Sequence, residues 1–196
     1  MSLPEPDDPL RAVVVLAGGG SRRLGHDKLA AALGDTTVLD TLLDAVAQHQ
    51  QHVPVVVVGP QRSTRTEVIW RFEDPPGGGP VAGLAAGIAE LDPADVVGVV
   101  AGDQPFAAPA LSVLLTALRA DELADAAIGV DPGGRDQPLL GVYRVAPLHQ
   151  AIGDVAAGRS VRSVVGQLAV VRVPLQPQWC LDVDTAADLA AVRASL

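Results

Sequence analysis

The sequence predicts an α/β fold, a three-layer α/β/α sandwich built around a mostly parallel sheet, and two observations support this prediction. Short apolar runs rich in β-branched residues lie at positions 13–16, 55–58 and 96–100. Such runs are typical of strands that helices cover on both faces. Segments with helical features separate the runs, and this alternation indicates right-handed βαβ units.

Four segments are expected to be helical. In residues 38–48 the apolar side chains recur at a spacing that places them on one face of a helix. Residues 80–91 and 109–118 each begin with proline, which is favoured in the first helical turn. Residues 185–196 begin with a threonine, a suitable N-cap, and carry an aspartate three positions later.

Residues 126–144 have a β-like composition, and their turn Asp131-Pro132-Gly133-Gly134 is typical of a hairpin. We therefore expect some antiparallel pairing late in the chain. In open α/β sheets the ligand binds at the carboxyl ends of the strands. The loops of interest are those that follow Ala17, Gly59, Asp74, Ala101 and Asp182.

Length, charge and cysteine content limit the function. The chain has 196 residues, and we expect residues 11–196 to form one domain after a tail, residues 1–10, that is disordered or derived from cloning. The net charge of −9 argues against a nucleic-acid partner. With one cysteine, no apolar stretch of membrane-spanning length and no signal peptide, we expect a cytoplasmic protein that binds no membrane.

The segment L-A-G-G-G-S-R-R-L-G-H-D-K, residues 16–28, contains the chain's single lysine, Lys28. Its glycines let the backbone approach a ligand, and its positive charges suit a polyphosphate. A Walker A loop is excluded because His26, not lysine, follows Gly25. A dinucleotide fingerprint, as in an oxidoreductase domain, is disfavoured because Arg23 stands where a small residue is needed.

The same segment resembles the pattern L-A-G-G-x-S-R-R-x-G-x-D-K of the molybdenum-cofactor guanylyltransferases (MobA) and related nucleotidyltransferases. Further matches are Glu73-Asp74 with G-G-G-P-V-A-G-L-A-A-G, then G-D-Q-P-F, G-R-D-Q-P-L-L-G-V-Y-R and D-V-D-T-A-A-D-L. The resemblance covers nearly the whole chain. It implies a Rossmann-like sheet of the nucleotide-diphospho-sugar transferase type.

The resemblance also implies roles for individual residues. Catalytic roles fall to Lys28, Arg22 and Arg23. Nucleotide contacts fall to Leu16, Ala17, Gly18, Gly19, Lys28, Gly59, Asp74 and Asp103. The cofactor Mg²⁺ is expected on Asp103, which follows a buried strand, and on Asp184.

Asp182-Val183-Asp184 departs from the N-x-N-T pattern that is common in the guanylyltransferases. Two carboxylates two residues apart in an extended segment point to one side, which suits a metal contact. The aspartate form resembles the related molybdenum-cofactor cytidylyltransferases. The identity of the base therefore stays open between guanine and cytosine.

Binding of the acceptor is expected at Asp136 and Gln137, whose side chains can hydrogen-bond a pterin ring, and at Arg159, which can meet a phosphate. The resemblance thus implies transfer of GMP from GTP to molybdopterin or its molybdenum form, with release of pyrophosphate. Molybdoenzymes and other cofactor-biosynthesis proteins are the expected protein partners. Two alternatives remain: another base or phosphorylated acceptor, and a nucleotide- or cofactor-binding module without turnover.

Overall fold

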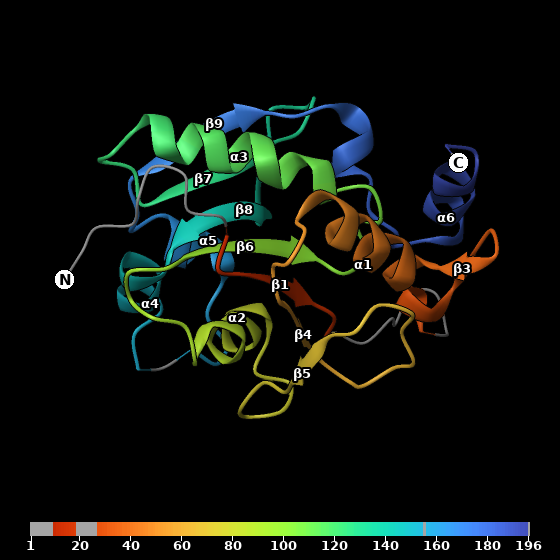
Figure 1. Cartoon of the computed structure of the whole chain (residues 1–196), viewed down its shortest axis with the longest axis horizontal. Helices are drawn as coiled ribbons and strands as arrows, with labels where there is room; N and C mark the ends of the chain where they lie inside the picture. Colours follow the sequence, from red (N-terminus) through yellow and green to blue (C-terminus); the bar gives the residue numbers. More distant parts are fainter. Residues whose placement is uncertain (1–9, 19–26, 155, 196) are drawn as a thin grey trace.

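The computed structural model describes residues 10–18, 27–154 and 156–195. Its central sheet has seven strands, and helices lie on either side of this sheet (Figure 1). The order of the strands is β5-β4-β1-β6-β8-β7-β9. Their bounds are β1 (Ala12–Leu16), β4 (Val55–Val58), β5 (Ile69–Arg71), β6 (Val96–Ala101), β7 (Ala126–Val130), β8 (Asp136–Arg144) and β9 (Val170–Pro174).

The helices are α1 (Val38–His49), α2 (Pro80–Ile88), α3 (Ala108–Ala120), α4 (Val145–Ile152), α5 (Val161–Val165) and α6 (Ala186–Arg193). Two short 3-10 helices, η1 (Lys28–Ala30) and η2 (Pro177–Cys180), and a small hairpin of β2 (Ala32–Leu33) and β3 (Thr36–Thr37) complete the described elements. A capping box between Thr185 and Asp188 begins α6, at the start that the sequence predicts.

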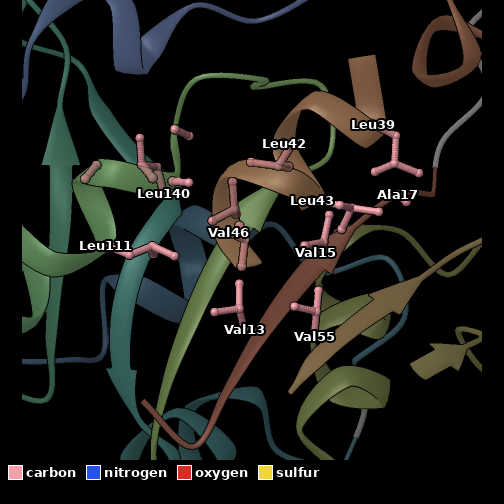
Figure 2. Close-up of a cluster of buried hydrophobic side chains, with 14 of the residues drawn as sticks. Val13, Val15, Ala17, Leu39, Leu42, Leu43, Val46, Val55, Leu111 and Leu140 are labelled. Carbon is pink, nitrogen blue, oxygen red and sulfur yellow. The ribbon is translucent and has the colours of Figure 1, made fainter. Parts of the chain in front are cut away.

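Helices cover both faces of the sheet, which confirms the predicted sandwich. α1 and α3 pack on one face, and α2, α4 and α5 on the other (Figure 1). β1 supplies side chains to both cores in alternation. Figure 2 shows Val13 and Val15 beneath α1, whereas Val14 belongs to the opposite core.

The pairing is mostly parallel, with the antiparallel part late in the chain, as predicted. β8 runs antiparallel to both β6 and β7, and the hydrogen bond from Gly134 N to Asp131 O closes the predicted turn at 2.9 Å. The sequence did not single out β5, β9, α4 or α5. These elements are short or partly exposed, so they lack a long apolar run.

The topology determines where a ligand can bind. The chain passes from β1 through α1 to β4 on one side, and later through α2 to β6 on the other side of β1. The carboxyl ends of β1 and β6 therefore flank a switch point, where open α/β sheets bind ligands. β8 starts at this same edge because it is antiparallel to β6.

The described start of the chain packs into the molecule. Leu10, the last residue of the segment that we assigned to the tail, is only 2% exposed in the core on the α1 face. Residues 1–9 lie outside the described part. Among the described helices, none is both long and apolar enough to cross a membrane.

Candidate active site

Three charged side chains from distant segments meet at the carboxyl ends of β1 and β6. The ammonium of Lys28 donates to Asp103 Oδ2 at 2.5 Å and to Asp184 Oδ1 at 2.7 Å. The side chains of Lys28 and Asp103 are 19% and 20% exposed, and that of Asp184 is 46% exposed. The site therefore has a sheltered ammonium between two carboxylates, one of which faces solvent.

Local structure after β1 places Lys28. Asp27 caps η1, with its Oδ1 accepting from Leu29 N at 3.2 Å, so Lys28 is the first residue of that 3-10 turn. Leu29 is 4% exposed and anchors the turn in the core. A Cβ at Gly102 would lie 3.3 Å from the tip of Leu29 and 3.1 Å from the carbonyl oxygen of Leu16. Glycine thus lets the turn after β6 pass close to β1.

A backbone contact brings the two aspartates together. Val183 N donates to the carbonyl oxygen of Asp103 at 3.0 Å, and the Val183 side chain is fully buried. This joins the segment before α6 to the turn after β6. The Asp188 carboxylate of the capping box also accepts from Asp184 N at 3.1 Å, which ties Asp184 to the start of α6.

The electrostatics follow from this crowding. Burial of the ammonium by itself would lower the pKa of Lys28, but its hydrogen bonds with Asp103 and Asp184 outweigh that effect and raise the pKa. Partial burial raises the pKa of Asp182, and the charges of Asp103 and Asp184 add to the shift. The cluster contains more negative than positive charge, which favours a cation.

The donor set suits Mg²⁺. Two carboxylate oxygens lie within 2.7 Å of a single point, the Lys28 nitrogen, so they can converge on one cation. Mg²⁺ is usually held by one or two carboxylates together with phosphate oxygens and water. Within residues 10–18, 27–154 and 156–195, no group of three or more His, Cys, Asp or Glu side chains could hold a metal. Phosphate oxygens of a substrate and water are ligands that could complete such a site.

Arg62, which sequence reasoning missed, lies beside this cluster in the loop after β4. Its guanidinium donates to Asp27 Oδ2 at 2.7 Å and to Asp27 Oδ1 at 3.1 Å. It also donates to the carbonyl oxygens of Ala17 and Pro60, at 3.1 and 2.8 Å. The hydrogen bond with Arg62 lowers the pKa of Asp27. The only available signal was the position of Arg62 in a loop of interest, the one after Gly59.

The predicted nucleotide contacts lie at the same edge, although not all in one cluster. Leu16 ends β1 and Ala17 and Gly18 follow it, and Gly59 passes so close that a Cβ there would lie 2.6 Å from the Ala17 carbonyl. Gly59 also has a φ of +143°, so this crossing requires glycine. Asp74 is exposed in the loop between β5 and α2. The predicted residues Gly19, Arg22 and Arg23 lie outside the described part of the chain.

The predicted acceptor residues have partners within the protein. Asp136 begins β8 and accepts from Arg172 Nε at 3.0 Å, and Gln137 Nε2 donates to Asp131 Oδ2 at 3.1 Å. Arg159 donates to the carbonyl oxygen of Ala151 at 2.8 Å and to that of Ile152, at the end of α4. The partners of these three residues lie in β9, in the turn between β7 and β8 and at the end of α4.

Comparison with known proteins shows which family the chain resembles. Residues 13–172 match the model of the MobA-like NTP transferase domain. A Mycobacterium marinum protein named probable molybdenum cofactor guanylyltransferase is 31% identical, with 95% of each chain covered.

Solved structures share the fold and confirm its nucleotide-diphospho-sugar transferase type. Molybdopterin-guanine dinucleotide biosynthesis protein A from Archaeoglobus fulgidus has a TM-score of 0.71 at 23% identity, covering 94% of this chain and 97% of that one. The 4-diphosphocytidyl-2C-methyl-D-erythritol synthase from Anaerococcus prevotii has a TM-score of 0.69 at 15% identity, covering 95% and 98%.

Proposed function

The chain belongs to the MobA-like NTP transferase family and is a nucleotidyltransferase; from this premise we propose that it transfers GMP from GTP to molybdopterin or its molybdenum form. The observation that carries the proposal is the convergence of Lys28, Asp103 and Asp184 at the switch point of the sheet. This is where a triphosphate would meet both a positive charge and carboxylates able to hold a metal.

The proposed reaction is an in-line displacement. A phosphate oxygen of the acceptor forms a bond to the α-phosphorus of GTP, and the bond from that phosphorus to the bridging oxygen breaks. Pyrophosphate leaves with the electron pair of the broken bond. The acceptor phosphate is already an anion, so no general base is needed, and the protein acts by positioning and by neutralising charge.

Within this scheme, Lys28 would turn from the aspartates toward the triphosphate, together with Arg22 and Arg23. Asp103 and Asp184 would then hold Mg²⁺, which when bound neutralises phosphate charge and orients the displacement. The geometry supports this division because the Lys28 ammonium and a cation would occupy the same place between the two carboxylates.

The nucleotide would lie along the end of β1, against residues 16–19 and Gly59, with Asp74 available to a ribose or base. The acceptor would lie toward the start of β8, where Asp136 and Gln137 stand at the same edge of the sheet. Arg159 is the proposed phosphate contact. These acceptor residues would have to exchange their present partners, Arg172, Asp131 and the α4 carbonyls.

A second candidate, cytidylyl transfer to the same cofactor, is favoured by one observation. The segment Asp182-Val183-Asp184 presents a carboxylate to Lys28 where N-x-N-T is common in guanylyltransferases. The two candidates share the reaction and differ in the base, so one experiment separates them.

The test is calorimetric titration with GTP and with CTP, with and without Mg²⁺, followed by pyrophosphate release in the presence of molybdopterin. Tight GTP binding that Lys28→Ala weakens, with weak CTP binding, supports guanylyl transfer. A preference for CTP over GTP would instead support cytidylyl transfer. Nucleotide binding without pyrophosphate release from the complete mixture would instead support a binding module that performs no turnover.

A further inference from the structure

Arg62 links three segments that surround the candidate active site. Its side chain is 15% exposed and makes four hydrogen bonds, two to the carboxylate of Asp27 and one each to the carbonyl oxygens of Ala17 and Pro60. Ala17 and Asp27 are the residues on either side of segment 18–26. A single guanidinium therefore binds both ends of the segment that precedes Lys28.

The loop that carries Arg62 is itself held firmly. Arg65 N donates to Asp40 Oδ1 at 3.0 Å, and Thr66 Oγ1 donates to Asp44 Oδ1 at 2.7 Å. Both aspartates belong to α1, and Asp40 is only 6% exposed. Arg62 thus extends from a loop anchored on a core helix, which makes it a fixed point against which other segments can be placed.

The contact with Asp27 leads directly to Lys28. Asp27 is the N-cap of η1, and Lys28 is the next residue. We propose that Arg62 is a positioning residue, which holds Ala17 and Asp27 at a set separation and so places the Lys28 ammonium against Asp103, Asp184 and the incoming triphosphate. The part that concerns the triphosphate rests on the proposed function.

The shape of arginine matters to this role. A guanidinium is a planar fork that can bind both carboxylate oxygens and still donate to carbonyl groups. A lysine at the same position keeps the charge but lacks the fork. Arg62→Lys is therefore expected to recover only part of the function lost in Arg62→Gln.

The experiment compares Arg62→Gln and Arg62→Lys with Arg65→Gln. Arg65 is a matched control because it lies in the same loop and its guanidinium donates to the carbonyl oxygen of Asp35, in the turn between β2 and β3, rather than to Ala17 or Asp27. We expect Arg62→Gln to weaken nucleotide binding about tenfold, since small misplacements of catalytic groups are costly. Arg65→Gln should change it by less than about twofold, as for surface contacts.

A double-mutant cycle with Lys28→Ala tests how Arg62 acts. If Arg62 works through Lys28, its replacement should add less than about twofold to the binding defect of Lys28→Ala. Fully additive effects would overturn the proposal, because Arg62 would then contact the nucleotide directly. Equal nucleotide affinity of wild type and Arg62→Gln would overturn it as well.

A second measurement needs no nucleotide. Lys28 is the only lysine of the chain, so protein labelled with ¹³C-lysine gives a single side-chain ε-CH₂ signal. Arg62→Gln should move this signal, Arg62→Lys should move it less, and Arg65→Gln should leave it unchanged. An unmoved signal in Arg62→Gln contradicts the positioning role. If the signal moves but the wild type binds neither GTP nor CTP, the proposed function fails and the positioning of Lys28 stands.

Discussion

Two groups of polar residues lie along the same edge of the sheet, and they are held in different ways. At the carboxyl ends of β1 and β6, Lys28 meets Asp103 and Asp184, which are 75 and 156 positions away in the chain. At the start of β8, Gln137 binds Asp131 only six positions away, and Asp136 forms an exposed pair with Arg172. The first group brings charged side chains together from separate segments. The side chains of the second group form a hydrogen bond and an ion pair with neighbouring residues.

This difference indicates which of the two groups is arranged to bind a ligand. Bringing an ammonium and several carboxylates together at a half-buried point adds little net stability, because lost hydration offsets much of the attraction. Such clusters in a crevice are candidates for function. Exposed pairs like Asp136–Arg172 contribute roughly 0–1 kcal/mol and can exchange partners easily.

The largest expected effect comes from removing a member of the first group. Lys28→Ala or Asp103→Asn should lower kcat/KM about 10²–10³-fold, as when a single charge-stabilising group is lost. Asp136→Asn should stay within about tenfold, since a replaceable surface contact is lost. Steady-state pyrophosphate release measures both. Comparable losses in the two groups would break the distinction between them.

The Lys28 ammonium and a metal ion should compete for the carboxylates of Asp103 and Asp184. Without nucleotide, Lys28→Met should bind Mn²⁺ about five- to tenfold more tightly than wild type, because a charge near the cation site is removed. Electron paramagnetic resonance of free Mn²⁺ measures the affinity. The double variant Lys28→Met with Asp184→Asn should lose this gain. Equal Mn²⁺ affinity in wild type and Lys28→Met would mean that the ammonium does not occupy the cation site.

For Arg159 we expect an effect on stability in addition to its proposed role in acceptor binding. Its guanidinium binds the carbonyl oxygens that end α4, so Arg159→Ala should lower Tm by about 3–6 °C. Arg162, an exposed residue of α5, provides the control, and Arg162→Ala should leave Tm nearly unchanged. If Arg159→Ala raises the KM for the acceptor without lowering Tm, its contacts with the end of α4 do not stabilise the fold.

The raised pKa of Lys28 predicts a pH dependence. A lysine whose pKa is higher in the folded state stabilises the fold below its unfolded pKa of about 10.4, and this contribution disappears as pH rises through the folded-state value. Titration of the single ¹³C-lysine signal should give a pKa above the ordinary value in wild type, and a lower one in Asp184→Asn. Wild-type Tm should also fall more steeply at alkaline pH than that of Lys28→Met.

The smallest effect is expected from the surface pair beside β8. Arg172→Gln should change Tm by less than about 3 °C, because exposed ion pairs contribute little. Thermal unfolding at low and high salt measures it, and the small difference should vanish in high salt. A large, salt-independent loss would show that this pair is part of the structural framework.

The fold was largely predictable from local patterns. The strands at 13–16, 55–58 and 96–100 are apolar runs, the third interrupted only by Gly98, and buried strands between helices need such runs. β5 escaped prediction because its three residues, Ile69–Arg71, are partly exposed at the edge of the sheet. α5 escaped because a five-residue helix shows hardly more than one turn of periodicity.

The residues of the candidate site also fall into those that the sequence predicts and those that it does not. Lys28, Asp103 and Asp184 could be named from motifs, since each motif is a short contiguous string. Arg62 could not, because its role depends on contacts with Asp27 and Ala17, which lie 35 and 45 positions away. The present partners of Asp136, Gln137 and Arg159 were likewise invisible in the sequence.

By itself, the sequence determined the buried strands, the hairpin turn, the cap of α6 and the family, because each rests on residues close together in the chain. Only the tertiary structure decided that the turn after β6 and the segment before α6 meet at Lys28, and that Arg62 joins the ends of segment 18–26. The physical reason is that these contacts depend on how the strands are ordered across the sheet, and strand order follows from packing of the whole chain.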